Sequence, residues 1–191
     1  KSLSDNQSNM SHPALFDIAG LTDIKNIDIL IDSIEILIKK GQIIHLYVAG
    51  DGPQKTQLLQ KIETKQIGDY IHLLGYRTDT EVFLNDCDIF VHPCYVEGFG
   101  ISVAEAMMAE KPMIVSDAGA LPELVKNEKS GLVVDPFDAN AWTEAILKLL
   151  EDKKMADEFG ENAGIRAKNE FSIDRYVSNY RDFYTSLMEQ K

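Results

Sequence analysis

The chain has 191 residues, of which 45% are hydrophobic and 26% charged, and its formal net charge is −12. This length suits a single well-packed domain. The acidic balance argues against general binding to nucleic acid or to anionic membranes, because such binding depends on surplus lysine and arginine. No apolar run approaches the roughly 20 residues that a membrane-spanning helix needs.

The cysteines and histidines indicate neither a disulfide framework nor a metal site. Cys87 and Cys94 have no CxxC spacing, and two thiols in a chain of this size favour a reducing compartment, so we expect a cytoplasmic protein with two buried thiols. The four histidines form no HxxxH or HExxH pair, and we therefore predict no metal site.

The order of the predicted elements is that of a doubly wound α/β domain. We assign residues 1–13 to a linker and residues 14–191 to one domain. Short apolar runs predict strands over residues 15–19, 45–49, 71–74, 89–92, 113–116 and 131–134, with helical periodicity between them. From residue 139 the chain is predicted to be helical, with breaks near Gly160 and at residues 171–172, where Ser172 is a predicted N-cap. The expected fold class is a parallel, Rossmann-like sheet of about six strands, with helices on both faces and C-terminal helices packing across it.

Three turns follow predicted strands at the edge where open parallel sheets bind their ligands, over residues 19–25, 50–53 and 97–102. In the third turn, Gly98 and Gly100 flank Phe99 and precede a helix whose N-terminus suits a diphosphate. Glu97 in this loop and Glu105 in the helix could flank one cleft and accept hydrogen bonds from sugar or ribose hydroxyls.

Spacing alone leaves other interpretations of these residues open. Ser102 and Glu105 have the spacing of a capping box, in which the glutamate would bond its own helix terminus. Asp51 lies in a tight turn that begins a helix. Cys94 has no identifiable base beside it, which favours a packed thiol over a nucleophile, and an acidic residue such as Glu123 is favoured near a helix start in any case.

A longer continuous pattern is more specific than these single features. Its parts are Glu97-x7-Glu105, KPMIVSD at residues 111–117, GALPELV at 119–125, SGLVV at 130–134, AGDGP at 49–53 and LGY at 74–76. From near Leu15 to Tyr184, the chain closely resembles the C-terminal domain of retaining glycosyltransferases of family 4. The resemblance implies one half of a GT-B fold that takes part in retaining sugar transfer from a nucleoside diphosphate sugar, without a metal or another cofactor. A UDP-sugar is the expected donor.

The resemblance also implies roles for individual residues. Glu97 and Lys25 would be catalytic, with Glu97 orienting the donor sugar and Lys25 meeting the diphosphate to offset charge on the leaving group. Glu105 would bind the ribose hydroxyls. Backbone N–H groups for the sugar and phosphates would come from Gly98, Phe99, Gly100 and Ile101, and the turn that holds the base from Gly75, Tyr76 and Arg77.

The resemblance further implies that a partner domain precedes residue 1. This N-terminal acceptor-binding domain would complete the cleft, so we expect the isolated domain to be inactive, and any peripheral membrane contact would pass through the missing domain. An aromatic stripe predicts a packing face on the last helix, which in the family crosses back to the other domain. The stripe consists of Tyr176, Tyr180, Phe183, Tyr184 and Leu187.

One position departs from the family pattern. The family usually has Gly-Arg-Leu after the first strand, whereas this chain has Ala19-Gly20-Leu21, so Gly20 replaces an arginine in the expected donor site. Losing a charge-assisted hydrogen bond to a phosphate weakens binding by about one to two orders of magnitude. We expect Arg77 to be a solvated loop arginine and not a substitute. The alternative function is therefore a non-catalytic glycosyltransferase-like subunit with a weakened donor site. A third is another GT-B enzyme, such as a nucleotide-sugar epimerase or a glycogen-type synthase.

Overall fold

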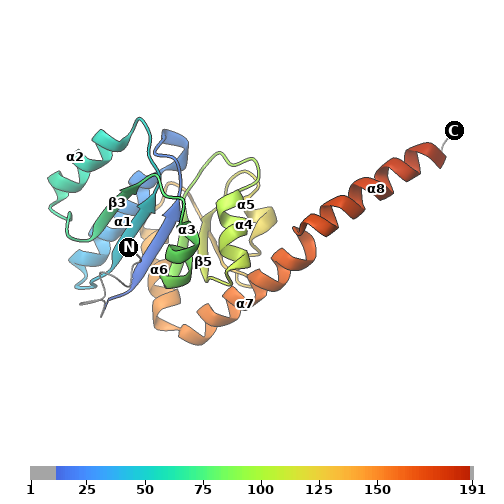
Figure 1. Ribbon diagram of the computed structural model, residues 1–191. Coiled ribbons are helices and arrows are strands. Elements are labelled where there is room, and N and C mark those ends of the chain that lie inside the picture. The colour runs from blue at the N-terminus through green and yellow to red at the C-terminus, as the bar shows by residue number, and fades with distance from the viewer. Residues whose placement is uncertain (1–11, 190–191) are drawn as a thin grey trace.

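The computed structural model describes residues 12–189, so the predicted linker falls almost entirely outside the described residues. Six strands form one sheet in the order β3-β2-β1-β4-β5-β6, and every neighbouring pair is parallel. The strands, seen in Figure 1, are β1 (Ala14–Ile18), β2 (His45–Ala49), β3 (Ile71–Gly75), β4 (Ile89–His92), β5 (Met113–Ser116) and β6 (Leu132–Val134). The predicted fold class is confirmed.

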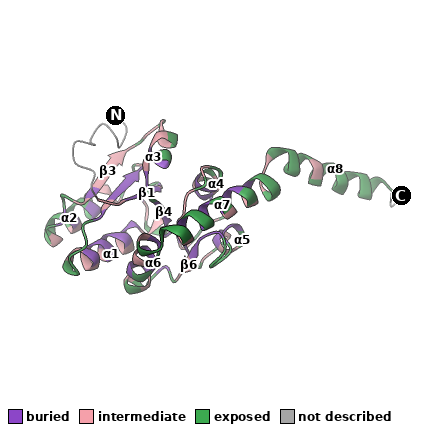
Figure 2. Cartoon of the chain, turned by 90° about the horizontal axis from the view of Figure 1, so that it is seen from below, coloured by how far each residue is buried: buried purple, intermediate pink, exposed green. Residues whose placement is uncertain are grey.

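Helices cover both faces of this sheet. They are α1 (Ile27–Lys39), α2 (Lys55–Lys65), α3 (Thr80–Asp86), α4 (Ile101–Met108), α5 (Leu121–Leu124), α6 (Ala139–Glu151), α7 (Lys153–Glu170) and α8 (Ile173–Glu189), with a short 3-10 helix, η2 (Asp23–Lys25), after β1. One apolar cluster packs α1, α2 and α6 against the sheet, and a second packs α3, α4 and α5 against the opposite face, with α7 contributing to both. Burial follows the same division in Figure 2, where purple marks the inner faces of these helices.

The strand order places a ligand crevice at the middle of the sheet. From β1 the chain adds β2 and then β3 on one side, and it then crosses to the other side of β1 to form β4. The loops after β1 and β4 therefore leave adjacent strands in opposite directions, and this reversal opens a crevice at the carboxyl ends of the strands.

The predicted helix break near Gly160 is wrong. Helix α7 runs through Gly160, and the break lies at Asp152, whose side chain accepts a hydrogen bond of 2.9 Å from the N–H of Met155 at the start of α7. Gly160 is instead required for packing, since a Cβ there would lie 2.2 Å from the carbonyl oxygen of Glu110. The second predicted break is confirmed, because Ser172 precedes α8 and its hydroxyl accepts a hydrogen bond from the Arg175 N–H.

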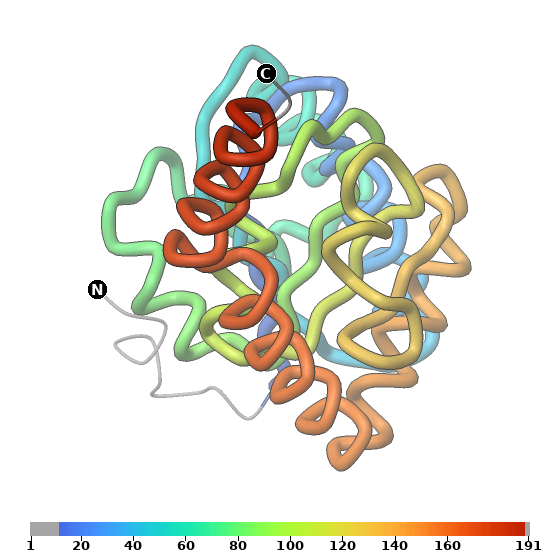
Figure 3. Tube along the Cα trace, turned by 90° about the vertical axis from the view of Figure 1, so that its right-hand side faces the viewer, coloured from blue at the N-terminus to red at the C-terminus, as the bar shows by residue number. Residues whose placement is uncertain are grey.

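Helix α8 leaves the body of the domain, as Figures 1 and 2 show, and none of its described residues is buried. Figure 3, which looks from the side on which α8 departs, shows it continuing from the end of α7. Within residues 12–189, the aromatic stripe predicted as a packing face forms ring contacts only along α8 itself, such as Tyr176 with Tyr180 at 4.6 Å between centroids. Among the described helices, none is long and apolar enough to cross a membrane.

Candidate donor-binding site

A cleft of about 600 Å³ opens at the carboxyl ends of the central strands. It brings together loops that are far apart in the sequence, namely those after β1, β2, β3 and β4, with the first turn of α4. Its lining comprises Ile18, Ala19, Gly20, Lys25, Gly50, Asp51, Tyr76, Arg77, Glu97, Phe99, Gly100, Ile101 and Ser102. Most of the residues predicted for the site therefore share one cleft. Gly75, Gly98 and Glu105 are the predicted residues outside its lining.

Backbone hydrogen bonds join the loops on the β1–β3 side of the cleft. Leu21 donates its N–H to the carbonyl of Asp51, and Gly50 donates its N–H to that of Gly75, with N–O distances of 3.0 and 2.9 Å. Close approach explains the glycine at residue 50, where a Cβ would lie only 1.9 Å from the Ala19 carbonyl oxygen. Gly75 thus does not line the cleft, but its carbonyl accepts a hydrogen bond from Gly50, which does.

Lys25 and Glu97 meet at the mouth of the crevice. The Lys25 Nζ lies 2.6 Å from Glu97 Oε2, and both side chains are largely buried. The two residues flanking Lys25 tie η2 to the loop after β4. The Ile24 carbonyl accepts a hydrogen bond from the N–H of Tyr95, and the side-chain Nδ2 of Asn26 donates to the Pro93 carbonyl. These contacts hold the segment that carries Lys25 against the loop that carries Glu97.

Behind Glu97 lies a buried pair that the sequence analysis did not identify. His92 at the end of β4 and Asp17 in β1 are both fully buried, and His92 Nδ1 lies 2.9 Å from Asp17 Oδ1. The other ring nitrogen, Nε2, lies 3.2 Å from Glu97 Oε2. The signals in the sequence were an aspartate inside the apolar run ALFDI and a histidine ending the run IFVH.

The pKa values of these groups shift as mutual ion pairing requires. Hydrogen bonds from His92 and then Lys25 hold the pKa of Glu97 far below its ordinary value of 4.5, against an opposing effect of burial. Burial works to lower the pKa of His92, but Asp17 and Glu97 outweigh it and raise that pKa well above 6.5. Burial likewise opposes protonation of Lys25, yet its hydrogen bond to Glu97 leaves the pKa raised. Glu97 therefore lies between Lys25 and His92, and its hydrogen bonds to both favour its charged form.

A metal is not needed to explain this cluster. Potential ligand atoms of His92, Cys94 and Glu97 lie within 4.8 Å of one another. Both nitrogens of His92 already bond carboxylates, however, and Glu97 pairs with Lys25, so a bound metal would have to displace a proton and the lysine. The contacts form a continuous chain from Asp17 through His92 and Glu97 to Lys25. Cys94 is a packed thiol whose Sγ donates to the Val96 carbonyl.

The N-terminus of α4 is free to receive a ligand. Its N-cap is Gly100, with a φ of 92°, and no side-chain hydrogen bond caps it, so the capping-box interpretation of Ser102 and Glu105 is not realised. Glu105 is exposed and lines a second cleft of about 480 Å³ with Leu84 and Glu81. Ile101 lines both clefts, which are therefore adjacent.

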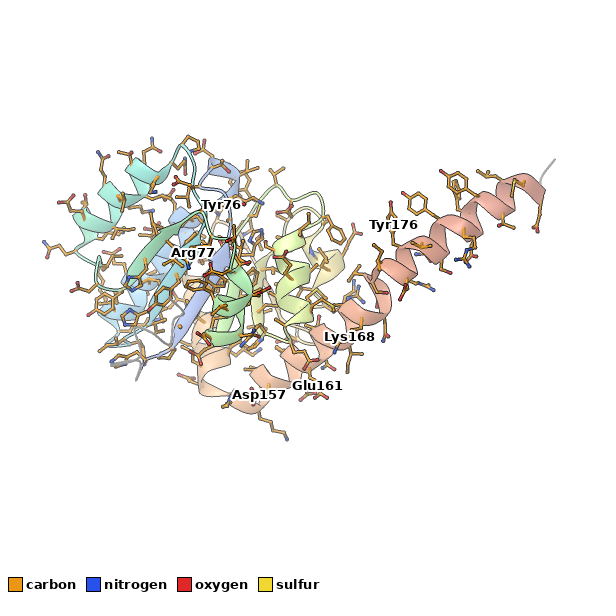
Figure 4. All side chains as sticks on the ribbon, viewed as in Figure 1. Tyr76, Arg77, Asp157, Glu161, Lys168 and Tyr176 are labelled. Atoms are coloured by element: carbon orange, nitrogen blue, oxygen red, sulfur yellow. The ribbon has the colours of Figure 1, made fainter. Side chains whose placement is uncertain are left out.

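The loop after β3 supplies an aromatic and a paired arginine to the cleft (Figure 4). Tyr76 is 80% exposed, which leaves its ring open to a ligand. The Arg77 guanidinium is bonded to Asp79 through two nitrogens, and it lies 5.0 Å from the centroid of the Phe83 ring. Arg77 thus lines the cleft with its guanidinium already paired to Asp79.

Two other predicted side chains have structural explanations. Asp51 accepts a hydrogen bond from the N–H of Gly52 and pairs with Lys55, as expected of a turn that begins a helix. Glu123 lies in the single turn of α5, outside the cleft lining. Gly20 lines the cleft, and a Cβ there would meet only the Asp51 carbonyl oxygen, at 3.8 Å.

Known proteins share both the sequence pattern and the fold. The family model described as glycosyl transferases group 1 matches residues 3–166. The poly(ribitol-phosphate) alpha-N-acetylglucosaminyltransferase of Staphylococcus aureus (strain COL) is 26% identical over 170 residues, which cover 88% of this chain and 34% of that protein. The chain thus spans about a third of this relative's length.

Two solved structures are similar to the chain. One is the C-terminal domain of a glycosyl transferase group 1 family protein (LpcC) from Francisella tularensis, with a TM-score of 0.76, 22% identity, and coverage of 89% of this chain and 93% of that one. The other is Anabaena Alr3699/HepE in complex with UDP-glucose, with a TM-score of 0.87, 23% identity, and coverage of 96% and 51%. The family match extends over most of the chain, and the fold agrees with it. The chain belongs to the group 1 glycosyl transferases and corresponds to their C-terminal domain.

Proposed function

We propose that this chain is the donor-binding domain of a retaining glycosyltransferase that transfers a sugar from a nucleoside diphosphate sugar to an acceptor. The observation that carries the proposal is the Lys25–Glu97 pair, placed in a cleft beside the uncapped N-terminus of α4. A cation, a helix N-terminus and a hydrogen-bond-accepting carboxylate are the groups that a diphosphate and its attached sugar require.

Each part of the donor has a matching part of the cleft. The diphosphate would lie against the backbone from Gly98 to Ile101, where the positive end of the α4 dipole points, and Lys25 would offset the charge that develops on it as it leaves. Glu97 would accept hydrogen bonds from the sugar hydroxyls. The ribose would reach Glu105 in the adjacent cleft, and Tyr76 would border the base.

We propose a UDP-sugar as the donor. This choice is supported by the similarity in fold to the Anabaena protein that was solved with UDP-glucose. Lys25 pairs with the sugar-facing carboxylate from the cleft side, and the proposed chemistry uses this lysine in place of a divalent metal.

The proposal includes an N-terminal acceptor-binding domain as the partner of this chain. Support comes from the length of the relatives, since the chain covers only 34% of the Staphylococcus aureus transferase and 51% of the Anabaena structure. The exposed aromatic face of α8 would contact that domain. The chain alone would therefore bind donor without turnover.

Calorimetry tests donor binding directly. The chain is titrated with UDP, ADP and GDP and with their sugars, and Lys25→Met is expected to weaken diphosphate binding by about 10- to 100-fold because a charge-assisted hydrogen bond is lost. Lys148→Met is the matched control, since Lys148 pairs with Glu128 outside the cleft. If no nucleoside diphosphate binds the unaltered chain, the proposed function is wrong.

A second candidate function is a non-catalytic, transferase-like subunit, which is favoured by Gly20. The residue lines the cleft without a side chain, and the only atom of the described chain within 4 Å of a Cβ added there is the Asp51 carbonyl oxygen, at 3.8 Å. Gly20→Arg is expected to tighten diphosphate binding by about tenfold or more if the arginine reaches a phosphate. In the protein joined to its N-terminal domain, robust sugar transfer that Glu97→Ala abolishes would rule out the non-catalytic subunit.

A further inference from the structure

We propose that His92, anchored by Asp17, is a positioning residue that keeps Glu97 ionised and correctly oriented when Lys25 turns from Glu97 to the donor diphosphate. This inference rests on the proposed function, because it concerns how the same cleft handles its donor. His92 lies behind Glu97 and outside the cleft lining, so it acts through Glu97 and does not touch the donor.

Lys25 and His92 share one oxygen of Glu97. Oε2 lies 2.6 Å from Lys25 Nζ and 3.2 Å from His92 Nε2, while Oε1 makes no hydrogen bond to the described chain. Oε1 is thus left to accept from a sugar hydroxyl. The arrangement fixes the Oε2 side of the carboxylate and leaves Oε1 available to a ligand.

Donor binding sets Glu97 and the diphosphate in competition for Lys25. A diphosphate carries more negative charge than a carboxylate and attracts the ammonium more strongly. If Lys25 were the only cation at Glu97, its departure would leave a largely buried carboxylate beside an anionic ligand, and the carboxylate would tend to take up a proton. A second, fixed cation prevents this.

His92 is suited to that task because it cannot leave. Its side chain and that of Asp17 have no exposed surface, and Asp17 Oδ1 holds the opposite ring nitrogen at 2.9 Å. The charged or titratable groups facing His92 are Asp17 from β1 and Cys94 and Glu97 from the loop after β4, with Lys25 from η2 on the far side of Glu97. The two carboxylates favour the imidazolium form.

Asp17 has no evident packing role. It interrupts a strand whose neighbouring residues form the apolar core, and its Oδ2 is buried without a hydrogen-bond partner in the described chain. A buried carboxylate oxygen in this state is costly, so the pair would be replaced by apolar side chains if packing alone mattered. Charging His92 explains why the aspartate is there.

The variant Asp17→Asn tests the charge of His92 while keeping a hydrogen-bonding side chain of similar shape. With the aspartate charge removed, the pKa of His92 should fall toward its ordinary value of 6.5. Calorimetry then compares the affinities for UDP-sugar and for UDP at pH values below and above 6.5. In Asp17→Asn, the ratio of UDP-sugar affinity to UDP affinity should fall about tenfold at the higher pH values and recover at the lower ones. The unaltered chain should keep the same ratio throughout.

An NMR titration of the His92 ring nitrogens separates this inference from the proposed function. An imidazolium that persists above neutral pH in the unaltered chain, but not in Asp17→Asn, supports the charge chain even if no nucleotide binds. A neutral ring at pH 7 overturns it. His72→Gln is the matched control, since His72 is a partly buried histidine of β3 paired with His45 outside the cleft.

The double variant Asp17→Leu/His92→Leu removes both charges together and avoids stranding either one in the core. It should still bind UDP within a few-fold, because Lys25 remains, while the preference for the UDP-sugar falls by about tenfold. Unchanged preference in a folded double variant overturns the inference.

Discussion

At the scale of single residues, charges of alternating sign run from the core to the cleft through Asp17, His92, Glu97 and Lys25. Each inner charge has an opposite charge on either side. Removing one member therefore leaves its neighbours uncompensated in a poorly solvated place, which costs more than the lost contact itself. The four residues are best understood as one unit.

The raised pKa of His92 predicts how stability depends on pH. Folding raises the affinity of this ring for its proton, so its contribution is complete below about pH 6.5 and is lost as the pH rises through the raised pKa of the folded state. The free energy of unfolding should decline in this window by up to about 1.4 kcal/mol per pH unit. Urea unfolding at a series of pH values measures the slope.

The double variant Asp17→Leu/His92→Leu provides the comparison for this slope, because it has no titrating ring at the site. Its unfolding free energy should be flatter over the same window. Equal slopes in the two proteins would show that His92 is not charged in the folded chain.

Sequence patterns predicted some of these residues and not others. Lys25 and Glu97 were predicted in one cleft through the family resemblance, and they do share it. The Asp17–His92 pair was missed because its members are 75 residues apart and meet only through the pairing of β1 with β4. No spacing rule connects two polar residues in separate apolar strands.

At the scale of elements, the position of Glu97 depends on a turn that follows a different strand. After β5, Gly119 has a φ of 55°, and Ala120 donates its N–H to the Glu97 carbonyl at 3.0 Å. A Cβ on Gly119 would lie 2.3 Å from that same carbonyl oxygen. The turn after β5 thus packs directly on the backbone of the site.

Gly119→Ala should therefore disturb the site through the backbone. The positive φ and the contact together should cost on the order of 1–3 kcal/mol of stability, and relief of the contact should displace Glu97. Chemical unfolding measures the first effect, and loss of donor-sugar affinity measures the second. The control is Gly41→Ala, which also has a positive φ but no atom within 4 Å of its Cβ position. Equal donor affinity in the two variants would contradict the prediction.

Local patterns predicted most element boundaries within a residue or two, since buried strands and amphipathic helices carry their period in the sequence. The prediction of a helix break at Gly160 was wrong because this glycine is required by tertiary packing. It permits α7 to approach the Glu110 backbone, and a local pattern cannot distinguish that role from a helix end.

At the scale of the whole molecule, the described chain divides into an α/β body and the projecting helix α8 (Figure 1). The body has its own apolar cores on both sheet faces, and α8 contributes no buried residue to either. Large apolar side chains along α8, including Tyr176 in Figure 4, are more than two-fifths exposed.

Deletion of residues 173–191 should therefore leave the body intact. The free energy of unfolding should change by no more than about 0.5 kcal/mol, because surface groups without buried partners contribute little. Concentration-dependent self-association should fall as the apolar surface is removed. Urea unfolding and sedimentation measure the two effects, and a large loss of stability would show that α8 supports the body.

The fold class was accessible from the sequence because the alternation of strands and helices permits few topologies. The direction of α8 was not. Its aromatic stripe predicts a packing face, but an apolar face alone does not indicate whether its partner lies within the same described chain.

The cleft has a consequence for folding equilibria. Its lining comes from segments between residues 18 and 102 that converge only through the parallel sheet, so an unfolded chain has no equivalent site. A ligand that binds there acts by mass action on the native state alone, adding about 2.7 kcal/mol when its free concentration reaches a hundred times the dissociation constant. The melting temperature of this chain should then rise with the concentration of any ligand that the cleft binds.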